Sequence, residues 1–402
     1  MRAITFGAKK NNEEKKDAAL STFVCAYFFL QALNLLVKMG DISIPAWNLI
    51  PKIILGVLLL IAIPAIVTRS GLKALLIELT VGAMFVFSSM MDSHPDVNLA
   101  SLAFDELVVF VPIGICAFCV SDYSALLIRL HRWSYPSHFI LYVLCFLLFR
   151  THAADYSYSM SVGYAVLFQM LIMIDSFTEK HSIIDLILVI ADLILIVMLG
   201  SRGPLLCLGV YAVFRILSGI KTARMKSVIL MLCCFIGAVL YLLYPYLLQL
   251  LVKLSSLLLG NTSRTIRLLL NEQLVYEAGR ETIYSYTLER IMERPILGWG
   301  VGGGWLNGVY PHNLLLEIAL SFGVPFAIVI TIWLLAVGVK GIGSRDREKK
   351  SVFLVFLSCS VSLLFSGSFL LSSTFFVAVL LGMKSDRRTG ANTLLYESAV
   401  YT

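Results

Sequence analysis

Residues 279–326 read GRETIYSYTLERIMERPILGWGVGGGWLNGVYPHNLLLEIALSFGVPF and concentrate polar and conformationally special residues in an otherwise apolar chain. The segment holds an arginine near its start, a cluster of glycines and His312. Residues 281–294 have apolar side chains near helical spacing and stop at Pro295, which predicts a short amphipathic helix. After the glycines, an apolar helix begins at Asn313. Its first turn is expected to point unpaired N–H groups outward, as binding of a phosphate requires.

The composition requires lipid as the solvent for most of the chain. Of the 402 residues, 59% are hydrophobic and 14% are charged, and the mean hydropathy is +0.87. A single soluble core cannot bury that much apolar surface. The formal net charge of +7 comes from short segments between apolar runs, where cations orient a membrane protein. Nucleic-acid binding is therefore not expected.

Apolar runs of spanning length predict an all-α, polytopic integral membrane protein with about twelve transmembrane helices. These runs lie at about 18–37, 47–67, 72–91, 102–120, 136–150, 158–175, 183–200, 203–218, 227–250, 313–339, 351–366 and 367–383. Residues 1–17 and 384–402 are expected to be cytoplasmic tails, because this orientation places most Lys and Arg residues on the cytoplasmic side. Residues 252–312 then form one long extracytoplasmic loop, with candidate helices at 263–278 and 281–294.

Neither a disulfide framework nor a metal site is predicted, and no cofactor is expected. All eight cysteines fall inside apolar runs and behave as small hydrophobic residues. The sequence has no H-E-x-x-H motif, no paired C-x-x-C motifs and no cluster of histidines. GWGVGG at 298–303 matches the dinucleotide pattern G-x-G-x-x-G, but no βαβ unit surrounds it. Its glycines are expected to let the backbone approach a ligand or to turn the loop toward the membrane.

Two arginines are candidate ligands for phosphate. Arg202 begins a helix in the sequence MLGSRGPLL at the expected outer boundary, where its charge needs either water or an anionic partner. A guanidinium presents a planar fork that suits phosphate oxygens. Arg280 stands at the entry of the predicted helix 281–294. The alternative for Arg202 is simple snorkelling to water, and for Arg280 a solvated side chain.

His312 is the candidate base. It is one of six histidines, it lies at the mouth of a helix, and its ordinary pKa of about 6.5 suits proton transfer near neutral pH. The alternative is a structural histidine held by hydrogen bonds. Asn313 is a predicted N-cap. Glu317 lies about 140° around the helix from His312, so the two cannot form a dyad on one face.

Other polar residues within the apolar runs must be paired or face water. Tyr158 and Tyr164 are expected either to line an outward-facing cavity that binds substrate or to pair structurally. Residues 123–135 read as a helix on the inner surface, with His131 and His138 as interfacial residues. The charged residues that need partners are Lys52, Glu78, Asp105, Glu106, Asp175, Asp185 and Asp192.

In their order along the chain these features resemble the domain shared by O-antigen ligases and O-antigen or capsular polysaccharide polymerases. The resemblance covers about residues 183–326. It consists of Ser201-Arg202-Gly203 after an apolar helix, Arg280 before Pro295-x-x-Gly298-x-Gly300, and His312-Asn313-x-x-Leu316-Glu317 with Gly323. The chain departs from the commoner pattern in its short interval from Gly304 to His312, and in Ser321, where an acidic residue is often found.

The resemblance implies a metal-independent membrane glycosyltransferase that uses a polyprenyl-pyrophosphate-linked donor. Residues 183–339 would form its catalytic domain, between N-terminal transmembrane helices (18–182) and the last ones (340–383). Carried onto this sequence, Arg202 and Arg280 would hold the pyrophosphate, and His312 would position or deprotonate the acceptor hydroxyl. Together with Asn313, Tyr158 and Tyr164, these residues make up the predicted substrate-binding site.

We expect a polymerase of O-antigen, capsular polysaccharide or exopolysaccharide in the bacterial cytoplasmic membrane. It would transfer an undecaprenyl-pyrophosphate-linked glycan onto another lipid-linked repeat unit at the outer face. Its partners would be the lipid-linked donor and acceptor and the bilayer, with a chain-length regulator protein as a candidate partner. One alternative is a ligase that transfers the glycan to the lipid A core.

An alternative from a different class is a multispan transporter or a flippase of lipid-linked oligosaccharides. The two classes require different residues to meet. A transporter would bring Glu78, Asp105 and Asp192 together near the middle of the membrane. The enzyme would bring Arg202, Arg280 and His312 together at the outer boundary.

Overall fold

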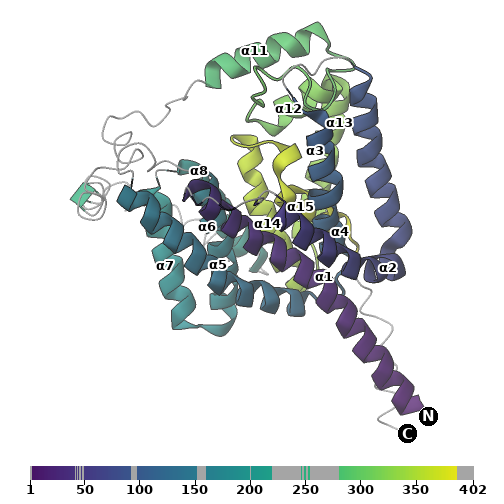
Figure 1. The fold of residues 1–402 in the computed structure, drawn as a ribbon, viewed down its shortest axis with the longest axis vertical. Helices are drawn as coiled ribbons and strands as arrows, with labels where there is room; N and C mark the ends of the chain where they lie inside the picture. The colour runs from purple at the N-terminus through teal and green to yellow at the C-terminus, as the bar shows by residue number, and fades with distance from the viewer. Residues whose placement is uncertain are drawn as a thin grey trace.

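The computed structural model describes residues 2–40, 49–91, 97–151, 160–199, 201–219 and 280–386, with single positions 42, 44, 47, 246, 249, 252 and 253 between them. Within these residues the fold is all-α, as predicted, and contains no strand (Figure 1). Almost all of the predicted span 227–250 and the whole candidate helix 263–278 lie outside the described residues.

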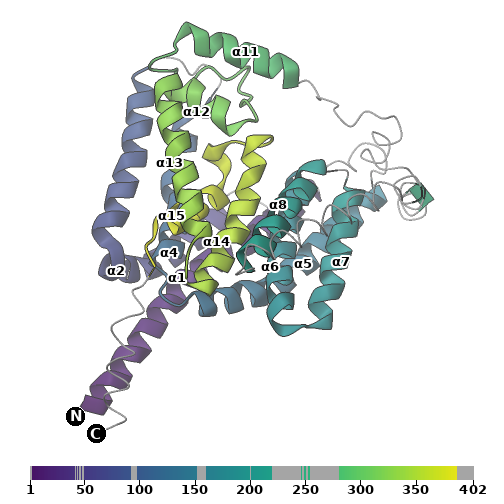
Figure 2. The ribbon, with the colours of Figure 1, turned by 180° about the vertical axis from the view of Figure 1, so that it is seen from behind.

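The helical elements follow one another around a bundle that Figure 2 shows from behind. They are α1 (Arg2–Met39), α2 (Ile50–Ser89), α3 (Leu99–Asp105), the π-helix η1 (Glu106–Phe110), α4 (Val111–Cys119), α5 (Tyr123–Thr151), α6 (Met160–Lys180), α7 (Ile183–Met198), α8 (Arg202–Gly219), α11 (Arg280–Glu293), α12 (Leu314–Phe322), α13 (Val324–Ile342), α14 (Arg347–Ser360), the 3-10 helices η2 (Val361–Leu364) and η3 (Phe369–Leu371), and α15 (Ser373–Met383). The predicted tail 1–17 is helical from residue 2 and continues directly into the first apolar run.

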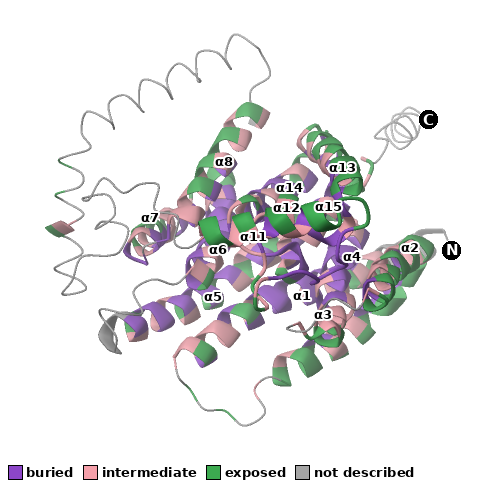
Figure 3. Ribbon diagram, turned by 90° about the horizontal axis from the view of Figure 1, so that it is seen from above, coloured by how far each residue is buried: buried purple, intermediate pink, exposed green. Residues whose placement is uncertain are grey.

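Among the described residues, five helical stretches are long and apolar enough to cross a membrane. They are Asn11–Met39, Ile50–Ser89, Leu99–Cys119, Met160–Lys180 and Val324–Ile342. A membrane protein with several spans is therefore supported, while the count of twelve stays a prediction. Apolar side chains are exposed along α2, α7 and α13, including Leu60, Ile187 and Leu335 (Figure 3). Lipid is the medium in which such faces are stable.

Helix α2 contains two of the predicted spans. Ser70 has non-helical backbone angles, φ −158° and ψ 31°, and divides α2 into two halves. Lys52, before this kink, lies beside the C-terminal part of α1, whereas Arg69 binds Asp17 near its N-terminal part. The first half therefore runs antiparallel to α1. The second half ends near the loop after α11, where the Ser88 hydroxyl accepts a hydrogen bond from the backbone of Val301 at 2.8 Å.

Basic residues that the sequence predicts to lie on the cytoplasmic side are found together at one end of the bundle. The Arg69 guanidinium lies 2.6 Å from Asp17 and 2.7 Å from Glu13, and it donates to the carbonyl of Cys119 at 3.0 Å. Lys384 donates to the carbonyl of Val120 at 2.6 Å. Helix α11 lies at the end of the molecule away from the start of α1 (Figure 1). Cations that were expected on the cytoplasmic side thus share one end of the bundle.

Three of the predicted helix boundaries are wrong. Residues 123–135 and 136–150 form one helix, α5, rather than a surface helix and a short span. The run 313–339 is broken into α12 and α13, because Gly323 has a φ of +83° and Pro325 starts the next helix. The last two runs contain the short helices α14 and α15, with 3-10 turns between them.

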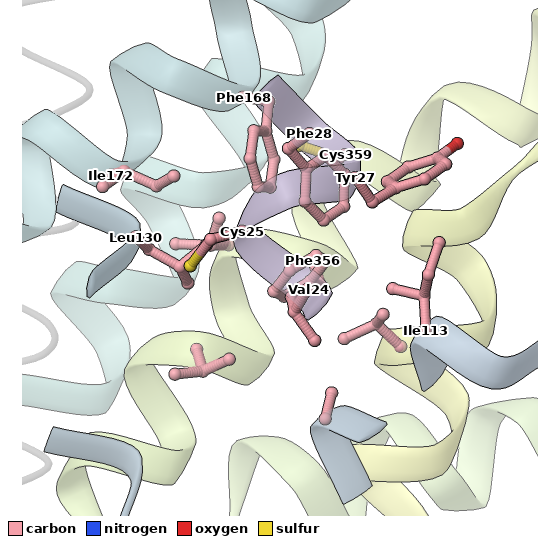
Figure 4. Packing of buried hydrophobic residues seen from close by; sticks show 14 of the residues in the cluster. Val24, Cys25, Tyr27, Phe28, Ile113, Leu130, Phe168, Ile172, Phe356 and Cys359 are labelled. Carbon is pink, nitrogen blue, oxygen red and sulfur yellow. The ribbon is translucent and has the colours of Figure 1, made fainter. Parts of the chain in front are cut away.

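The packed core joins both ends of the sequence. Phe28 of α1 stacks on Phe168 of α6 with ring centroids 4.1 Å apart. Phe356 of α14 lies 5.5 Å from Phe28 and 5.4 Å from Phe168 (Figure 4). Aromatic contacts of this kind stabilise a core beyond simple area burial. Helices α1, α6 and α14 are therefore fixed relative to one another.

Hydrogen-bonded His–Asp pairs connect α5 to α7. His131 lies 3.1 Å from Asp185, and His138 lies 2.7 Å from Asp192. The prediction that both histidines are interfacial is wrong for His138, which is only 2% exposed. Asp192 needs this partner because an unpaired carboxylate within an apolar helix is costly.

Arg69→Met should lower the free energy of unfolding by roughly 3 kcal/mol, since Asp17 would stay buried without its partner. The measurement is thermal unfolding of the purified protein in detergent. Lys73→Met is the matched control, because Lys73 is exposed three positions beyond the kink at Ser70. Equal unfolding midpoints for the two variants would contradict a structural role for the ion pairs of Arg69 with Asp17 and Glu13.

Candidate functional site

Helix α11 crosses the end of the bundle above α12 (Figure 1). It spans Arg280–Glu293, so the helix predicted at 281–294 is confirmed. Arg280 is its first residue and is half-buried. Pro295 follows the helix and cannot continue it, which forces the chain into the glycine-rich loop 298–304.

The glycine-rich loop is bonded through its backbone to the break between α12 and α13. The N–H of Trp299 donates to the carbonyl of Leu320 at 2.8 Å, and the N–H of Gly300 donates to the carbonyl of Ser321 at 2.9 Å. In return, the N–H of Val324 donates to the carbonyl of Pro295 at 2.8 Å. These bonds hold the two segments side by side through their backbones.

Two glycines make this approach sterically feasible. A Cβ on Gly298 would lie 2.6 Å from the backbone of Ser321, and a Cβ on Gly323 would lie 2.1 Å from the carbonyl oxygen of Ile296. Both glycines also have positive φ, +68° and +83°. Of the two roles expected for glycines in this loop, close approach to a ligand is not what these positions serve. They bring the loop against its own chain.

Trp299 fixes the C-terminal end of α11 on this loop. Its indole N–H donates to the carbonyl of Arg290 at 2.7 Å. The guanidinium carbons of Arg290 and Arg294 lie 3.5 and 3.9 Å from the centroid of its ring. Cation–π contacts of this geometry stabilise the packing of arginine on tryptophan. Neither arginine was singled out in the sequence.

His312 is held in an unusual backbone conformation beside an aromatic ring. Its φ is +56°, a value that residues other than glycine rarely adopt and that clusters at functional sites. The ring centroid lies 4.4 Å from that of Tyr310. Its Nδ1 atom is buried and has no hydrogen-bond partner among the described residues. The imidazole is thus available to a ligand.

Asn313 caps α12, as predicted, and this corrects the expectation for the first turn. Its Oδ1 accepts hydrogen bonds from the N–H groups of Leu315 at 3.0 Å and Leu316 at 3.2 Å. Its Nδ2 donates to the carbonyl of Leu364 at 3.1 Å. These two N–H groups are therefore occupied rather than free for a phosphate. The structure gives Asn313 a structural role, and its contact with substrate stays a prediction.

Arg280 and His312 are close enough to interact electrostatically. Burial of the imidazole and the positive charge of Arg280 both lower the pKa of His312 below its ordinary value of about 6.5. The imidazole is consequently neutral at neutral pH. No carboxylate among the described residues forms an ion pair with Arg280.

A cavity of about 330 Å³ lies close to His312 and to the start of α8, although neither His312 nor Arg202 lines it. Tyr164 and Tyr310 both line it. Tyr310 contacts His312, and Tyr164 packs so closely on Gly203 that a Cβ there would lie 2.1 Å from the tyrosine oxygen. The structure therefore places Tyr164 and Tyr310 on one cavity, with His312 next to Tyr310 and the start of α8 next to Tyr164. Tyr158 lies outside the described residues.

Glu317 is not one of the residues at this cavity. It is fully buried and accepts hydrogen bonds from the Ser368 hydroxyl and from the N–H of Phe369, the latter at 3.2 Å. Glu317 thereby attaches α12 to the turn before α15. In the part of the chain that the structure describes, no group of three His, Cys, Asp or Glu side chains could hold a metal ion.

Residues 187–331 match the family model described as O-Antigen ligase. Over these residues the chain is similar to the O-antigen polymerase and ligase family, which supports the resemblance seen in the sequence. The matched residues include Arg202, Arg280 and His312. Members of this family are membrane enzymes of the glycosyltransferase type that act on lipid-linked saccharides. A comparison with curated proteins found no match.

Gly323→Ala should lower the free energy of unfolding by more than roughly 2 kcal/mol, because the positive φ and the overlap with Ile296 both penalise a Cβ. Gly338→Ala in α13 is the matched control. A Cβ at Gly338 meets nothing within 4 Å, so this variant should be unchanged or more stable by up to about 1 kcal/mol. Thermal unfolding of both variants checks the difference, and equal midpoints would contradict the packing role of Gly323.

The pH dependence of turnover should reflect the lowered pKa of His312. A base must be unprotonated, so the rate falls only as the pH drops through the pKa of the imidazole. Because that pKa lies below about 6.5, turnover should be constant around pH 7 and have an acid midpoint under this value. A pH–rate profile of the purified enzyme measures it. A midpoint above pH 7 would contradict the neutral imidazole.

Proposed function

We propose that the protein is a polysaccharide polymerase of the outer face of the cytoplasmic membrane. It transfers a glycan from undecaprenyl pyrophosphate onto the terminal sugar of another lipid-linked repeat unit, without a metal or cofactor. One observation carries the proposal: the Arg280 charge acts on a neutral, strained His312, whose neighbour Tyr310 shares a cavity with Tyr164, and Tyr164 packs on the start of α8. A guanidinium and a neutral imidazole are the groups that such a transfer requires.

The proposed reaction assigns one role to each group. A hydroxyl of the acceptor sugar attacks the anomeric carbon of the donor glycan, and a new C–O bond forms there. The bond from that carbon to the pyrophosphate oxygen breaks, and undecaprenyl pyrophosphate leaves with the bonding electrons. His312 takes the proton of the hydroxyl, while Arg280 and Arg202 stabilise the negative charge that develops on the leaving group.

The position of α11 supports an outward-facing site. Arg280 and His312 lie at the end of the bundle opposite the cations that bind Asp17 and Val120. If those cations face the cytoplasm, as the positive-inside rule favours, the site faces the exterior. Donor and acceptor reach it there as lipid-linked glycans.

A ligase is the second candidate, and the description of the matching family favours it directly. The two functions share the donor, the leaving group and the three residues above, and they differ only in the acceptor. For the ligase, the acceptor hydroxyl belongs to the lipid A core. A transporter is less well supported, because Asp105 pairs with Lys52 and Asp192 pairs with His138 instead of meeting each other.

Arg280→Ala, Arg202→Ala and His312→Ala should each reduce turnover by at least about a hundredfold, as loss of an electrostatic or proton-transfer group does. Lysine at either arginine position should rescue poorly, because it lacks the planar fork. The measurement is gel analysis of products after reconstitution of the purified protein with a lipid-linked repeat unit, with and without a lipid A core acceptor.

Arg132→Ala is the matched control, since Arg132 is exposed on α5 outside the cavity. It should retain wild-type turnover. A ladder of products identifies a polymerase, and a single glycan joined to the core identifies a ligase. No transferred product from the wild-type protein, or full-length polysaccharide from any of the three variants, would contradict the proposed chemistry.

A further inference from the structure

A serine-rich segment joins α14 to α15. Residues 358–374 read SCSVSLLFSGSFLLSST and contain seven serines. The segment includes the 3-10 helices η2 and η3 and lies beneath α12 (Figure 2). It falls outside the residues that match the family model.

The lengths of the flanking helices place this segment below the outer boundary of the membrane. Helix α14 has 14 residues and α15 has 11, so at 1.5 Å per residue they are about 21 and 17 Å long, against a hydrocarbon thickness of about 30 Å. Both begin or end at the basic end of the bundle, where Lys349 binds Asp386 at 2.9 Å. The chain therefore turns before it reaches the opposite boundary, and a hollow is left above the turn.

The hollow is the cavity that Tyr164 and Tyr310 line. Six of its lining residues are hydroxyl residues of the serine-rich segment, namely Ser362, Ser366, Ser368, Ser372, Ser373 and Thr374. The rings of Phe28, Phe168, Tyr164 and Tyr310 line the same cavity. The described residues that line the cavity include no Asp, Glu, Lys, Arg or His. A hydroxyl donates and accepts hydrogen bonds without a net charge.

We infer that this cavity is the subsite for an uncharged sugar ring of the acceptor glycan. Sugar rings present hydroxyls at their edges and C–H groups on their faces, which match serine hydroxyls and aromatic rings. A diphosphate would lose its hydration there without meeting a cation. The ring centroids of Tyr310 and His312 are 4.4 Å apart, so a sugar that packs on Tyr310 in the cavity is one side chain away from the proposed base. The assignment to the acceptor rests on the proposed function.

The first experiment measures sugar binding independently of turnover. Methyl glycosides of glucose, galactose and mannose are added to the purified full-length protein in lipid nanodiscs, and saturation-transfer NMR detects the bound ring protons. Inorganic pyrophosphate is the charged competitor. We expect at least one glycoside to bind and pyrophosphate not to displace it. Absence of glycoside binding, or displacement by pyrophosphate, would overturn the proposal.

Two variants and a matched control locate the binding. Ser372→Phe fills the cavity and should abolish the signal. Thr374→Val removes one hydroxyl at nearly constant volume and should weaken binding about tenfold. Thr331→Val makes the same change in α13, where the hydroxyl donates to Ala327 outside the cavity, and should have no effect. If Ser372→Phe does not fold, as judged by size-exclusion chromatography, the comparison of glycoside binding by Thr374→Val and by Thr331→Val tests the location of the site.

A transfer assay separates this proposal from the proposed function. With a lipid-linked donor at saturation, Thr374→Val should raise the KM for the acceptor about tenfold and leave kcat nearly unchanged. An unchanged KM in an active enzyme overturns the acceptor subsite while the proposed function stands. Glycoside binding that Ser372→Phe abolishes, in a protein without any transferase activity, supports a sugar-binding cavity and overturns its acceptor role together with the proposed function.

Discussion

The arrangement of the site depends on backbone contact between the glycine-rich loop and the break between α12 and α13. Three N–H···O=C bonds join the loop to this break, and Gly298 and Gly323 remove the side-chain atoms that would keep the segments apart. The contact fixes where α11 ends. Because α11 is a rigid helix, it also fixes Arg280 at the other end, about 20 Å along the axis. A change at the loop therefore displaces a charge that the loop never touches.

The charges near His312 are arranged in a consistent way. Glu317, the acidic residue that follows it most closely in the sequence, is bonded to Ser368 and Phe369 and does not neutralise the site. Arg280 therefore acts on His312 without a competing carboxylate from α12. Burial lowers the pKa of the imidazole most, and the positive charge of Arg280 lowers it further. The same positive charge would attract an anionic leaving group, so it favours both an unprotonated base and the binding of negative charge.

Features determined by local sequence could be predicted, and features determined by tertiary contact could not. The helix at 281–294 and the N-cap Asn313 depend on neighbouring residues, and both were found. The break at Gly323 was missed because the prediction of one helix rested on the apolar residues of the whole run 313–339. Gly323 followed by Pro325 is nevertheless a local signal for a break. His138 and Asp192, which form a hydrogen bond, are 54 positions apart in the sequence, so no local pattern could identify the pair. The one sequence signal for this pairing is that the two histidines, at 131 and 138, and the two aspartates, at 185 and 192, have the same spacing of seven residues.

The site itself combines both kinds of feature. Order along the chain indicated which residues could carry chemistry, but nothing in that order gave the distance between Tyr164 and Tyr310. Their placement on one cavity depends on two features. The packed rings of Phe28 and Phe168 hold α1 against α6, and the short helices α14 and α15 end below the outer boundary of the membrane. The serine-rich turn was invisible as a site because serines in apolar helices commonly bond their own backbone, as Ser360 does.

The juxtaposition of a cationic region and an uncharged cavity bears on a difficulty that any such transferase faces. Under the proposed function, donor and acceptor are both lipid-linked glycans, so recognition of the lipid or of a sugar alone cannot tell them apart. They differ in the part that each presents to the reacting centre: the donor presents its pyrophosphate, and the acceptor presents its terminal sugar. An anion is stable beside Arg280 and unstable among the uncharged hydroxyls and rings, because the cavity offers it no counter-charge. Orientation of the two substrates then follows from the fold, since each end of a glycan is favourable on only one side of His312.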